Sequence, residues 1–397
     1  FKRGYELALK DTHHPIVPFY IRGLWGSTFS RARDYYKEIH ASQRDIIVSF
    51  GKPLPSTTLA PQVKQKVVEL SYGAWSHYIN TLQPLHYEWL KTTKKRLFKR
   101  SIVDSLGTDL SGGKLLTAVL LFAPQIRAFR QPNVGILLPS SSIGAIVNLA
   151  VLIGGKRAIN LNYTASQLGL ESAVIQADIE SVITSRAFLE KLASRGITLN
   201  EATMSRCVYT EDIAQTFSKV KKISALLQAY LMPRWMIRLF YFVPTTLDDV
   251  ATILFSSGSE SLPKGIELTH RNLIANIKQV SDLLNFKKDD AMLNSLPIFH
   301  SFWLTVTLLL PLVKGVEVIS LPDPTDALGV GKMVARYRAT IIFGTSTFYR
   351  LYIRNTKLHP LMFQSVRLAV AGAQKLSPDV KDAFKEKFGL VLYEGYG

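Results

Sequence analysis

Residues Leu254 to Gly265 read LFSSGSESLPKG, a stretch of serine and glycine that ends in a lysine and a glycine. The apolar residues ATILF before it predict a strand. After it, LTHRNLIANIKQVSDLL predicts a helix, with Thr269 as its candidate N-cap and with apolar residues at helical spacing at Leu273, Ile277, Val280 and Leu284. A strand, a loop and a helix in this order predict an α/β fold, with backbone N–H groups gathered at the loop.

The loop contains the donors that a polyphosphate requires, namely hydroxyl groups, backbone N–H groups and one cation. Its candidate binding residues are Ser256, Ser257, Gly258, Ser259, Glu260, Ser261, Lys264 and Gly265. The stretch differs from the P-loop pattern GxxxxGK[ST], because Pro263 stands where the second glycine belongs and Gly265 stands where Ser or Thr belongs. The alternative interpretation is a flexible loop exposed to solvent.

Strand and helix patterns alternate from about residue 100 onward. The expected strands are NVGILLP, SVITS, ATILFSS, AMLNSLPI, VEVISLP, ATIIFGT, VRLAVAGA and LVLYEGYG. This alternation predicts a doubly wound, parallel α/β sheet that binds ligands at the carboxyl ends of its strands. The apolar segments 143–155 and 302–313 are shorter than the ~18 residues of a membrane-spanning helix, so we expect them to be buried elements.

Three further strand ends carry candidate site residues. His300 follows the strand in SLPIFHSFW, and Gly372 and Ala373 form a small-residue turn in LAVAGAQKLSP. The last strand ends in Glu394, Gly395, Tyr396 and Gly397. A lone histidine is more often structural than functional, but several such ends in one sheet favour a shared site in which a flat ring lies against backbone.

The net charge of +18 predicts an acidic partner, which from charge alone is nucleic acid, an anionic bilayer or an acidic protein. The first hundred residues hold 17 basic and 7 acidic side chains, and TTKKRLFKR (residues 92–100) is their densest basic run. This run is either a solvated linker or a lipid-facing surface. YLMPRWMIRLFYF (residues 230–242) has the composition of an interfacial helix interrupted at Pro233, or of a helix packed in the core. The single cysteine, Cys207, excludes an internal disulfide.

The four strand-end motifs together resemble those of the adenylate-forming superfamily of acyl and aryl ligases. SSGSESLPKG is similar to its phosphate signature, LPIFHSF to its substrate-pocket motif, and AGAQKL and YEGYG to its adenine-side motifs. The resemblance covers residues 101–397 and implies an AMP-binding adenylation domain with ATP and Mg²⁺ as cofactors. It implies catalytic roles for Lys264 and His300. It assigns no metal ligand, because the family's magnesium-side glutamate follows the last motif.

Residues 1–100 resemble the C-terminal part of the glycerolipid acyltransferases. The similarity rests on FKRGYELALK, on the Val-Pro strand at Val17 and Pro18, and on the closing FGKP of IIVSFGKPLP. HASQRD (His40 to Asp45) matches the H-x4-D pattern of a general base in that family. It follows the Val-Pro strand, whereas the family's pair precedes it, so we predict that HASQRD is not catalytic.

The two parts in this order resemble the bacterial family of bifunctional acyl-[acyl-carrier-protein] synthetases / 2-acylglycerophosphoethanolamine acyltransferases. This resemblance implies a fatty acid, acyl carrier protein, lysophospholipid and an anionic membrane surface as partners, and no nucleic acid. It implies a peripheral location at the cytoplasmic face of the bacterial inner membrane. We expect residues 1–397 to be incomplete for both reactions. The alternatives are a long-chain fatty acid–CoA ligase and a non-catalytic fragment that binds membrane or carrier protein.

Overall fold

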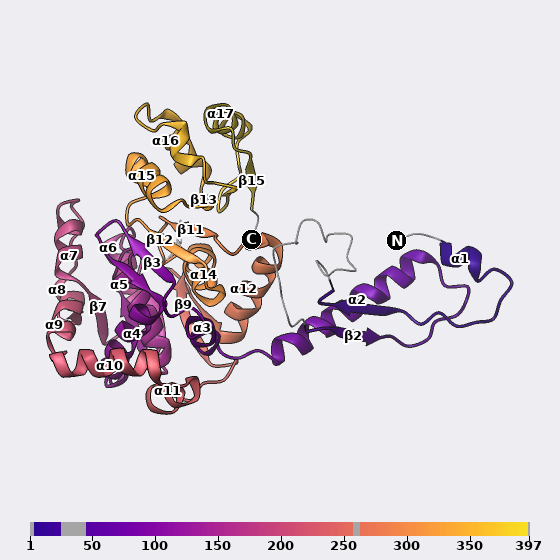
Figure 1. Cartoon of the computed structure of the whole chain (residues 1–397), viewed down its shortest axis with the longest axis horizontal. Coiled ribbons are helices and arrows are strands. Elements are labelled where there is room, and N and C mark those ends of the chain that lie inside the picture. The colour runs from indigo at the N-terminus through magenta and orange to yellow at the C-terminus, as the bar shows by residue number, and fades with distance from the viewer. Residues whose placement is uncertain (1–3, 25–44, 257–262, 396–397) are drawn as a thin grey trace. The chain divides into compact units, whose positions relative to one another are not determined.

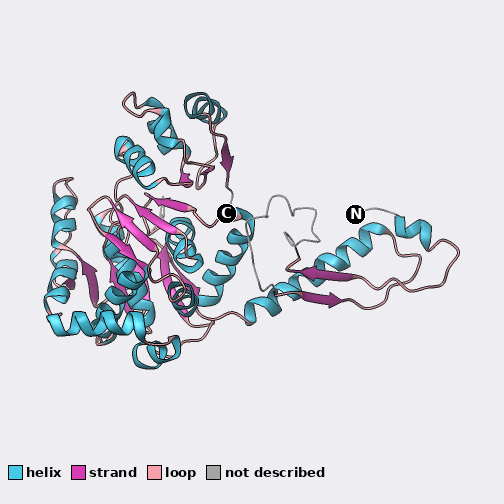
Figure 2. Ribbon diagram, viewed as in Figure 1, coloured by secondary structure: helices cyan, strands magenta, loops and turns pink. Residues whose placement is uncertain are grey.

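The computed structural model describes residues 4–24, 45–256 and 263–395. The chain divides into two compact units, of which the first comprises residues 1–83 with 285–288 and the second comprises 84–284 with 289–397. The secondary structure of both units is shown in Figure 2.

The first unit is a two-stranded antiparallel sheet packed on a long helix. Its elements are α1 (Gly4–Ala8), β1 (Phe19–Arg22), β2 (Ile47–Phe50) and α2 (Ala60–Asn80). The Arg22 guanidinium lies over the rings of Trp75 and Tyr78, at 4.4 and 3.4 Å from their centroids. The segments PIVPFYIRG and DIIVSFGKPLP each have a short apolar pattern that predicts a strand, and they contain β1 and β2 respectively. Residues 40–44 of HASQRD lie outside the described residues.

The sequence from Pro61 to about Leu90 has a helical pattern that predicts one helix, and this prediction is wrong in its length. α2 ends at Asn80, and a separate helix, α3 (Leu85–Thr93), begins after Pro84. The ring of a proline disfavours helical backbone at the residue before it, so Pro84 begins a new helix and does not continue α2.

The second unit contains two sheets with helices packed around them (Figure 1). The six-stranded sheet has the order β10-β9-β6-β5-β7-β8, and the seven-stranded sheet has the order β15-β14-β13-β11-β12-β3-β4. The strands of the first are β5 (Asn133–Ile136), β6 (Arg157–Asn160), β7 (Ser181–Thr184), β8 (Cys207–Tyr209), β9 (Val250–Phe255) and β10 (Gly265–Thr269). Those of the second are β3 (Arg100–Asp104), β4 (Asp109–Ser111), β11 (Ala291–Asn294), β12 (Glu317–Ser320), β13 (Ile341–Gly344), β14 (Leu368–Ala371) and β15 (Leu392–Glu394).

The doubly wound α/β prediction is confirmed, with one addition at the sheet edges. Neighbouring strands are parallel except for the edge pairs β9–β10 and β3–β4, which are antiparallel. The expected strands correspond to β5, β7, β9, β11, β12, β13, β14 and β15. Strands β3, β4, β6, β8 and β10, which have three to five residues each, were not expected.

The helices connect the strands and cover the sheets. Between β4 and β9 they are α4 (Gly112–Arg127), α5 (Ser142–Ile153), α6 (Gln167–Gln176), α7 (Arg186–Ala193), α8 (Glu201–Met204), α9 (Thr210–Gln215), α10 (Lys219–Leu231) and α11 (Arg234–Tyr241). After β10 they are α12 (His270–Leu284), α13 (Ser301–Trp303), a π-helix (Leu304–Leu309), α14 (Leu310–Lys314), α15 (Ala327–Tyr337), α16 (Ser346–Arg354), a 3₁₀ helix (Pro360–Phe363) and α17 (Pro378–Phe388).

The two long apolar segments are buried, as expected. Every residue of α5 except Ile143 is buried, and so is every residue from Trp303 to Val313. Within the described ranges, no helix has the length and apolar content needed to cross a bilayer.

The basic run TTKKRLFKR packs within the second unit and does not form the linker that was one of its two interpretations. The Thr92 hydroxyl donates to the Val313 carbonyl at 2.7 Å. The Lys94 ammonium donates to the carbonyls of Ala229 and Tyr230 at 2.9 and 3.2 Å. Residues 84–100 belong to the second compact unit, and the domain boundary at residue 100 that the motif resemblance implies stays a prediction. The assignment of the first unit to an acyltransferase stays a prediction.

Buried polar contacts join the two sheets. One Asp104 carboxylate oxygen, at the end of β3, accepts the N–H of Ser142 at the start of α5 at 3.0 Å. Its other oxygen accepts the N–H groups of Leu106 and Thr108 at 3.1 and 3.0 Å. The Ser140 hydroxyl, after β5, donates to the Leu296 carbonyl, after β11. These contacts fix the ends of strands from different sheets beside one another.

We expect Asp104→Asn to destabilise the second unit by about 1–3 kcal/mol, because an amide nitrogen replaces one of two carboxylate oxygens that both accept hydrogen bonds in a buried site. Urea unfolding monitored by circular dichroism measures the loss. The matched control is Asp109→Asn, whose side chain is 50% exposed and pairs with Arg100. Equal stabilities for the two variants would contradict the role of Asp104 in joining the sheets.

Candidate active site

A cleft of about 690 Å³ opens where strands of both sheets end. Segments that follow the carboxyl ends of β6, β11, β12, β13, β14 and β15 line it. Its walls comprise Tyr163, Thr164, Arg195, Leu296, Pro297, Phe299, His300, Ser301, Phe302, Trp303, Pro322, Asp323, Pro324, Thr325, Thr345, Thr347, Phe348, Ala373, Gln374 and Gly395. This is the position that the parallel-sheet prediction gives for a ligand site.

His300 is one of the predicted residues that reach the cleft. It precedes α13, and its ring centroid lies 4.7 Å from that of Phe299. The Phe299 ring also packs edge-to-face on the ring of Tyr163, which follows β6 of the other sheet, with 4.9 Å between the ring centroids. Loss of surrounding water lowers the pKa of His300 below its usual value. A neutral imidazole presents one donor and one acceptor to a substrate at neutral pH.

The predicted small-residue turn also lies in the cleft. The Gly372 N–H donates to the Gly344 carbonyl at 2.9 Å, and the Gly395 N–H donates to the Ala371 carbonyl at 2.7 Å. A Cβ atom at Gly372 would lie 3.5 Å from both the Gly395 carbonyl oxygen and the Phe302 ring. Ala373 has a left-handed backbone with φ of 63°, which costs an L-residue about 1–2 kcal/mol. The turn thus presents backbone and small side chains to the cleft.

The Glu394 carboxylate forms a hydrogen bond with the protein backbone. One of its carboxylate oxygens accepts the Leu376 N–H at 3.0 Å, which ties β15 to the segment after the turn. Gln374, beside Ala373, accepts a hydrogen bond from the Thr347 hydroxyl at 2.9 Å. Neither Gln374 nor Thr347 was predicted; both follow strand ends and carry polar side chains, which is the signal that could have identified them.

The Gly/Ser loop connects β9 to β10, and these two strands pair antiparallel. The Ser256 N–H donates to the Lys264 carbonyl at 3.0 Å, and the Lys264 N–H donates to the Ser256 hydroxyl at 3.1 Å. Gly265 is the first residue of β10 and pairs with Phe255. The strand–loop–helix prediction is therefore wrong by one element, because β10 intervenes before the helix.

The predicted cap of the following helix is present. The Thr269 hydroxyl accepts the Asn272 N–H at 3.2 Å, and the Asn272 side chain accepts the Thr269 N–H at 2.9 Å. This reciprocal pair satisfies backbone donors at the first turn of α12.

The structure thus places the predicted site residues in three groups. His300, Ala373 and Gly395 line the cleft, with Gly372 adjacent to it. Ser256, Lys264, Gly265 and Glu394 are not among the described residues that line it. Residues Ser257, Gly258, Ser259, Glu260, Ser261, Tyr396 and Gly397 lie outside the described residues.

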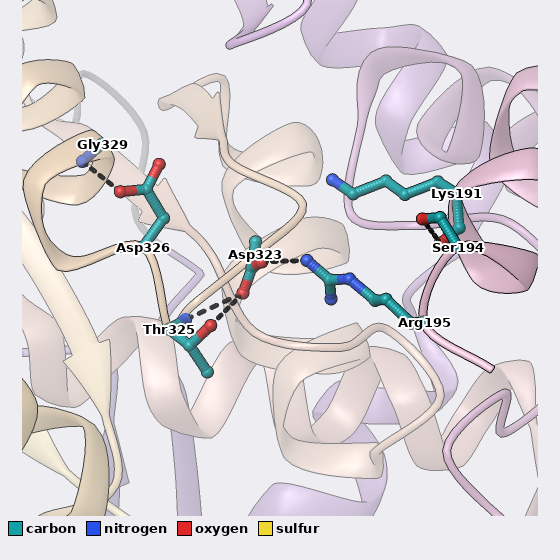
Figure 3. A network of polar contacts seen from close by, with 7 residues as sticks. All are labelled: Lys191, Ser194, Arg195, Asp323, Thr325, Asp326 and Gly329. Atoms are coloured by element: carbon teal, nitrogen blue, oxygen red, sulfur yellow. Dashed lines mark hydrogen bonds and ion pairs between the residues drawn. The ribbon is translucent and has the colours of Figure 1, made fainter. Parts of the chain in front are cut away.

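An ion pair that was not predicted connects the two sides of the cleft. The guanidinium of Arg195, which follows α7, contacts the Asp323 carboxylate, which follows β12 (Figure 3). The N–H and hydroxyl of Thr325 donate to the other Asp323 oxygen at 3.0 and 2.6 Å. Burial alone would raise the pKa of Asp323, but these hydrogen bonds and the Arg195 charge outweigh it and lower that pKa. No local motif predicts this pair, because 128 residues separate Arg195 from Asp323 in the sequence.

Residues 91–397 match the family model of the AMP-binding enzymes. The chain belongs to the AMP-binding enzyme family. The match covers both sheets of the second unit and every element that lines the cleft. It confirms the adenylate-forming fold that the sequence motifs predicted.

Two ligases are similar in sequence to this AMP-binding chain. A long-chain-fatty-acid–CoA ligase of Escherichia coli O6:H1 is 32% identical over 165 residues, which are 40% of this chain and 29% of that protein. 4-coumarate-CoA ligase 1 of Narcissus pseudonarcissus is 28% identical over 279 residues, which are 68% of this chain and 48% of that protein. The chain therefore spans less than half the length of either relative.

Solved structures share the fold. The ATP-bound MatB of Rhodopseudomonas palustris has a TM-score of 0.61 at 22% identity, covering 80% of this chain and 60% of MatB. The inhibitor-bound N-terminal domain of FACL13 of Mycobacterium tuberculosis has a TM-score of 0.66 at 17% identity, covering 80% of this chain and 76% of that domain.

We expect a double-mutant cycle with Arg195→Met and Asp323→Asn to give a coupling energy of about 0.2–1 kcal/mol at neutral pH, since the Arg195 side chain is half exposed. The pKa of Asp323 is lower in the folded state than in the unfolded state. The coupling energy is therefore present above the unfolded-state pKa of about 3.9, and it is lost as the pH falls through the folded-state pKa. Urea unfolding at pH 7 and at about pH 3 measures it. A coupling energy that is unchanged at the lower pH would contradict the pairing.

Proposed function

We propose that this chain activates a fatty acid with ATP as an acyl-adenylate and directs the acyl group to a thiol. The observation that supports this proposal is the cleft, where an imidazole, a backbone-lined turn and apolar walls meet at the carboxyl ends of strands from both sheets. The family membership and the names of the fatty-acid ligases among the relatives support the same activity.

The first step joins the carboxylate to AMP. A carboxylate oxygen attacks the α-phosphorus of ATP, a P–O bond forms, and pyrophosphate leaves with the electrons of the bond that breaks. In the second step the thiol sulfur attacks the acyl carbon, AMP leaves, and the thiol proton passes to solvent or to a base. Both steps place negative charge on a leaving phosphate, so positively charged and N–H donors near it lower the barrier.

The described residues suit distinct parts of these substrates. The turn at Gly372, Ala373 and Gly395 offers a flat face of backbone on which adenine can lie. His300, neutral at physiological pH, would donate a hydrogen bond to the fatty carboxylate. The rings of Phe299, Phe302, Trp303 and Phe348 form the apolar walls against which an acyl chain would lie. Ser256 and Lys264, with residues 257–261 between them, would hold the β- and γ-phosphates.

Magnesium enters the proposal through the triphosphate. Within the described ranges there is no group of three or more His, Cys, Asp or Glu placed to hold a metal. Mg²⁺ in nucleotide sites is commonly held by phosphate oxygens, water and one or two carboxylates, so a dedicated protein cage is not required. When bound, the ion would neutralise charge on the phosphates. Glu394 would be free for this role only if its contact with Leu376 opened.

Coenzyme A and acyl carrier protein are the two candidate thiol acceptors. The names of the fatty-acid–CoA ligases among the relatives support coenzyme A. The motif resemblance of the whole sequence supports acyl carrier protein, and the net charge of +18 suits that acidic partner. Supplying a protein that carries this chain with ATP, magnesium, a long-chain fatty acid and either thiol, then weighing the thioester by mass spectrometry, distinguishes them. ATP binding without turnover by either thiol would favour the non-catalytic alternative.

For the first unit we propose membership of a lysophospholipid acyltransferase that works beside the ligase at the cytoplasmic face of the bacterial inner membrane. The support is its sequence alone, namely the Val-Pro segment at Val17 and Pro18 and the FGKP closing segment. Acylation of lysophosphatidylethanolamine by a protein that carries this unit tests the proposal.

We expect Lys264→Ala to reduce acyl-adenylate formation by at least about a hundredfold, because a single well-placed donor to transition-state charge contributes about 3 kcal/mol. ATP–pyrophosphate exchange in a protein that carries this chain measures the rate. The matched control is Lys332→Ala, which removes an exposed lysine from α15, outside the cleft. Equal exchange rates in the two variants would rule out the phosphate role of Lys264.

We also expect Gly372→Val to weaken ATP binding at least about tenfold while leaving the melting temperature nearly unchanged. The added Cβ has ordinary 3.5 Å contacts, but its methyl groups would occupy the face proposed for adenine. Gly73→Val, at a glycine of α2 with nothing within 4 Å, is the control. Isothermal titration with ATP measures the dissociation constants, and an unchanged value for Gly372→Val would place the adenine elsewhere.

A further inference from the structure

Helices α10 and α11 expose an apolar surface to solvent where most helices would bury one. On α10, Val220, Ile223, Leu227 and Leu231 follow one another at helical spacing and are 53–76% exposed. The opposite side of α10, with Ala225 and Ala229, is buried, and the helix packs on α4. Figure 1 shows α10 and α11 at the same edge of the second unit, beside α4. A helix of a soluble domain normally turns its apolar stripe inward, so this pattern is reversed.

Helix α11 continues the exposed surface with larger side chains. Trp235, Leu239 and Phe240 are 65, 69 and 60% exposed, while Ile237 on the other side of the helix is fully buried. Pro233 stands between the helices and starts α11 as its N-cap residue. The sequence indicated an interfacial helix only for residues 230–242. The structure extends the apolar surface through the whole of α10.

The basic run TTKKRLFKR lies against this same surface. The Phe98 ring is 84% exposed and lies 5.3 Å from the Tyr230 ring at the end of α10. Lys94 donates to the carbonyls of Ala229 and Tyr230, which holds the run in place. Two features more than a hundred residues apart in the sequence therefore form one surface, with Lys95 and Lys99 exposed beside it.

The charged residues on α10 and α11 are all of one sign. The sequence has no acidic residue between Asp212 and Asp248. The exposed charged residues of α10 and α11 are Lys219, Lys221, Lys222, Arg234 and Arg238. Together these helices and residues 94–99 form what we call the docking face, an apolar centre of aliphatic and aromatic side chains with a basic rim.

We propose that the docking face binds the surface of an anionic bilayer, with α10 and α11 lying in the plane of the membrane. Trp, Phe and Leu side chains enter the boundary between head groups and acyl chains, and Lys and Arg beside them pair with lipid phosphates. A second copy of the chain fits this face poorly, because two such faces would bring their basic rims together. The proposal stands on the exposed side chains and their charges, so it is independent of the ligase activity.

The test is flotation of the full 397-residue chain with vesicles, compared between phosphatidylcholine alone and equal parts of phosphatidylcholine and phosphatidylglycerol. We expect binding to the anionic vesicles that falls steeply as salt rises, because screening weakens charge attraction. Replacing Lys219, Lys221 and Lys222 with Gln should weaken it roughly a hundredfold, about fivefold for each charge. Equal binding to both vesicle types would overturn the proposal.

The apolar contribution is tested by two paired variants. Ile223→Ser with Leu227→Ser on α10, and Trp235→Ser with Leu239→Ser on α11, should each weaken binding at least about tenfold. The matched control is Leu168→Ser with Ile175→Ser on α6, which removes two side chains that are 73 and 65% exposed outside the docking face. A loss in the control equal to that in the α10 and α11 variants would overturn the assignment of the face. Circular dichroism confirms that each variant is folded.

The depth of Trp235 separates membrane insertion from attraction by charge alone. Vesicles with brominated acyl chains should quench part of the tryptophan emission of the wild-type chain, since a bromine in the acyl region quenches only an indole that reaches it. This quenching should be absent in Trp235→Phe. If the emission of Trp235 is not quenched, the helices do not enter the bilayer. Displacement of the vesicles by an equimolar acidic protein, such as an acyl carrier protein, would show that the face serves a protein partner and overturn the lipid assignment.

Discussion

The site depends on the contact between two sheets that close around it. Asp104 at the end of β3 holds the start of α5, Ser140 after β5 holds the Leu296 carbonyl after β11, and Arg195 reaches Asp323. Each contact joins the carboxyl end of a strand, or the loop after it, to a partner from the other sheet. The hydrogen bonds of Asp104 and Ser140 are buried and costly to break, since a donor or acceptor left unpaired in the interior loses the water it would otherwise bind. The cleft is thus a consequence of how the two sheets are joined.

The joined sheets give the cleft two unlike walls. One is built of backbone and small residues at Gly372, Ala373 and Gly395, and the other of aromatic rings beside His300. In the proposed function, the adenine ring would lie on the first wall and the acyl chain on the second. The left-handed backbone at Ala373 lies in this wall, and strained backbone is often concentrated at functional sites.

The docking face lies on a different part of the second unit from the cleft and differs from it in exposure and in charge. Its apolar side chains are exposed and its charges are of one sign, whereas the cleft holds few charges, with Arg195 and Asp323 paired to each other. A fatty acid is dissolved mainly in membranes, so an enzyme that takes up such a substrate gains from lying on the membrane surface. The same argument applies to the lysophospholipid proposed for the first unit.

The sequence by itself determined the fold class and the order of most strands, because apolar runs of four or five residues bounded by polar or small residues are local signals. It also predicted His300, Gly372, Ala373 and Gly395 as site residues from their positions after apolar strand patterns, and the structure places them in the cleft or beside it, while their roles stay predictions. It missed β10 after the Gly/Ser loop, where the pattern GIELT alternates too briefly to indicate a strand. The tertiary structure alone decided the pairing of Arg195 with Asp323, the contact of Asp104 with Ser142, and the meeting of Phe98 with α10. These depend on residues far apart in the chain, and their proximity comes from sheet order and helix packing, which no short stretch of sequence encodes.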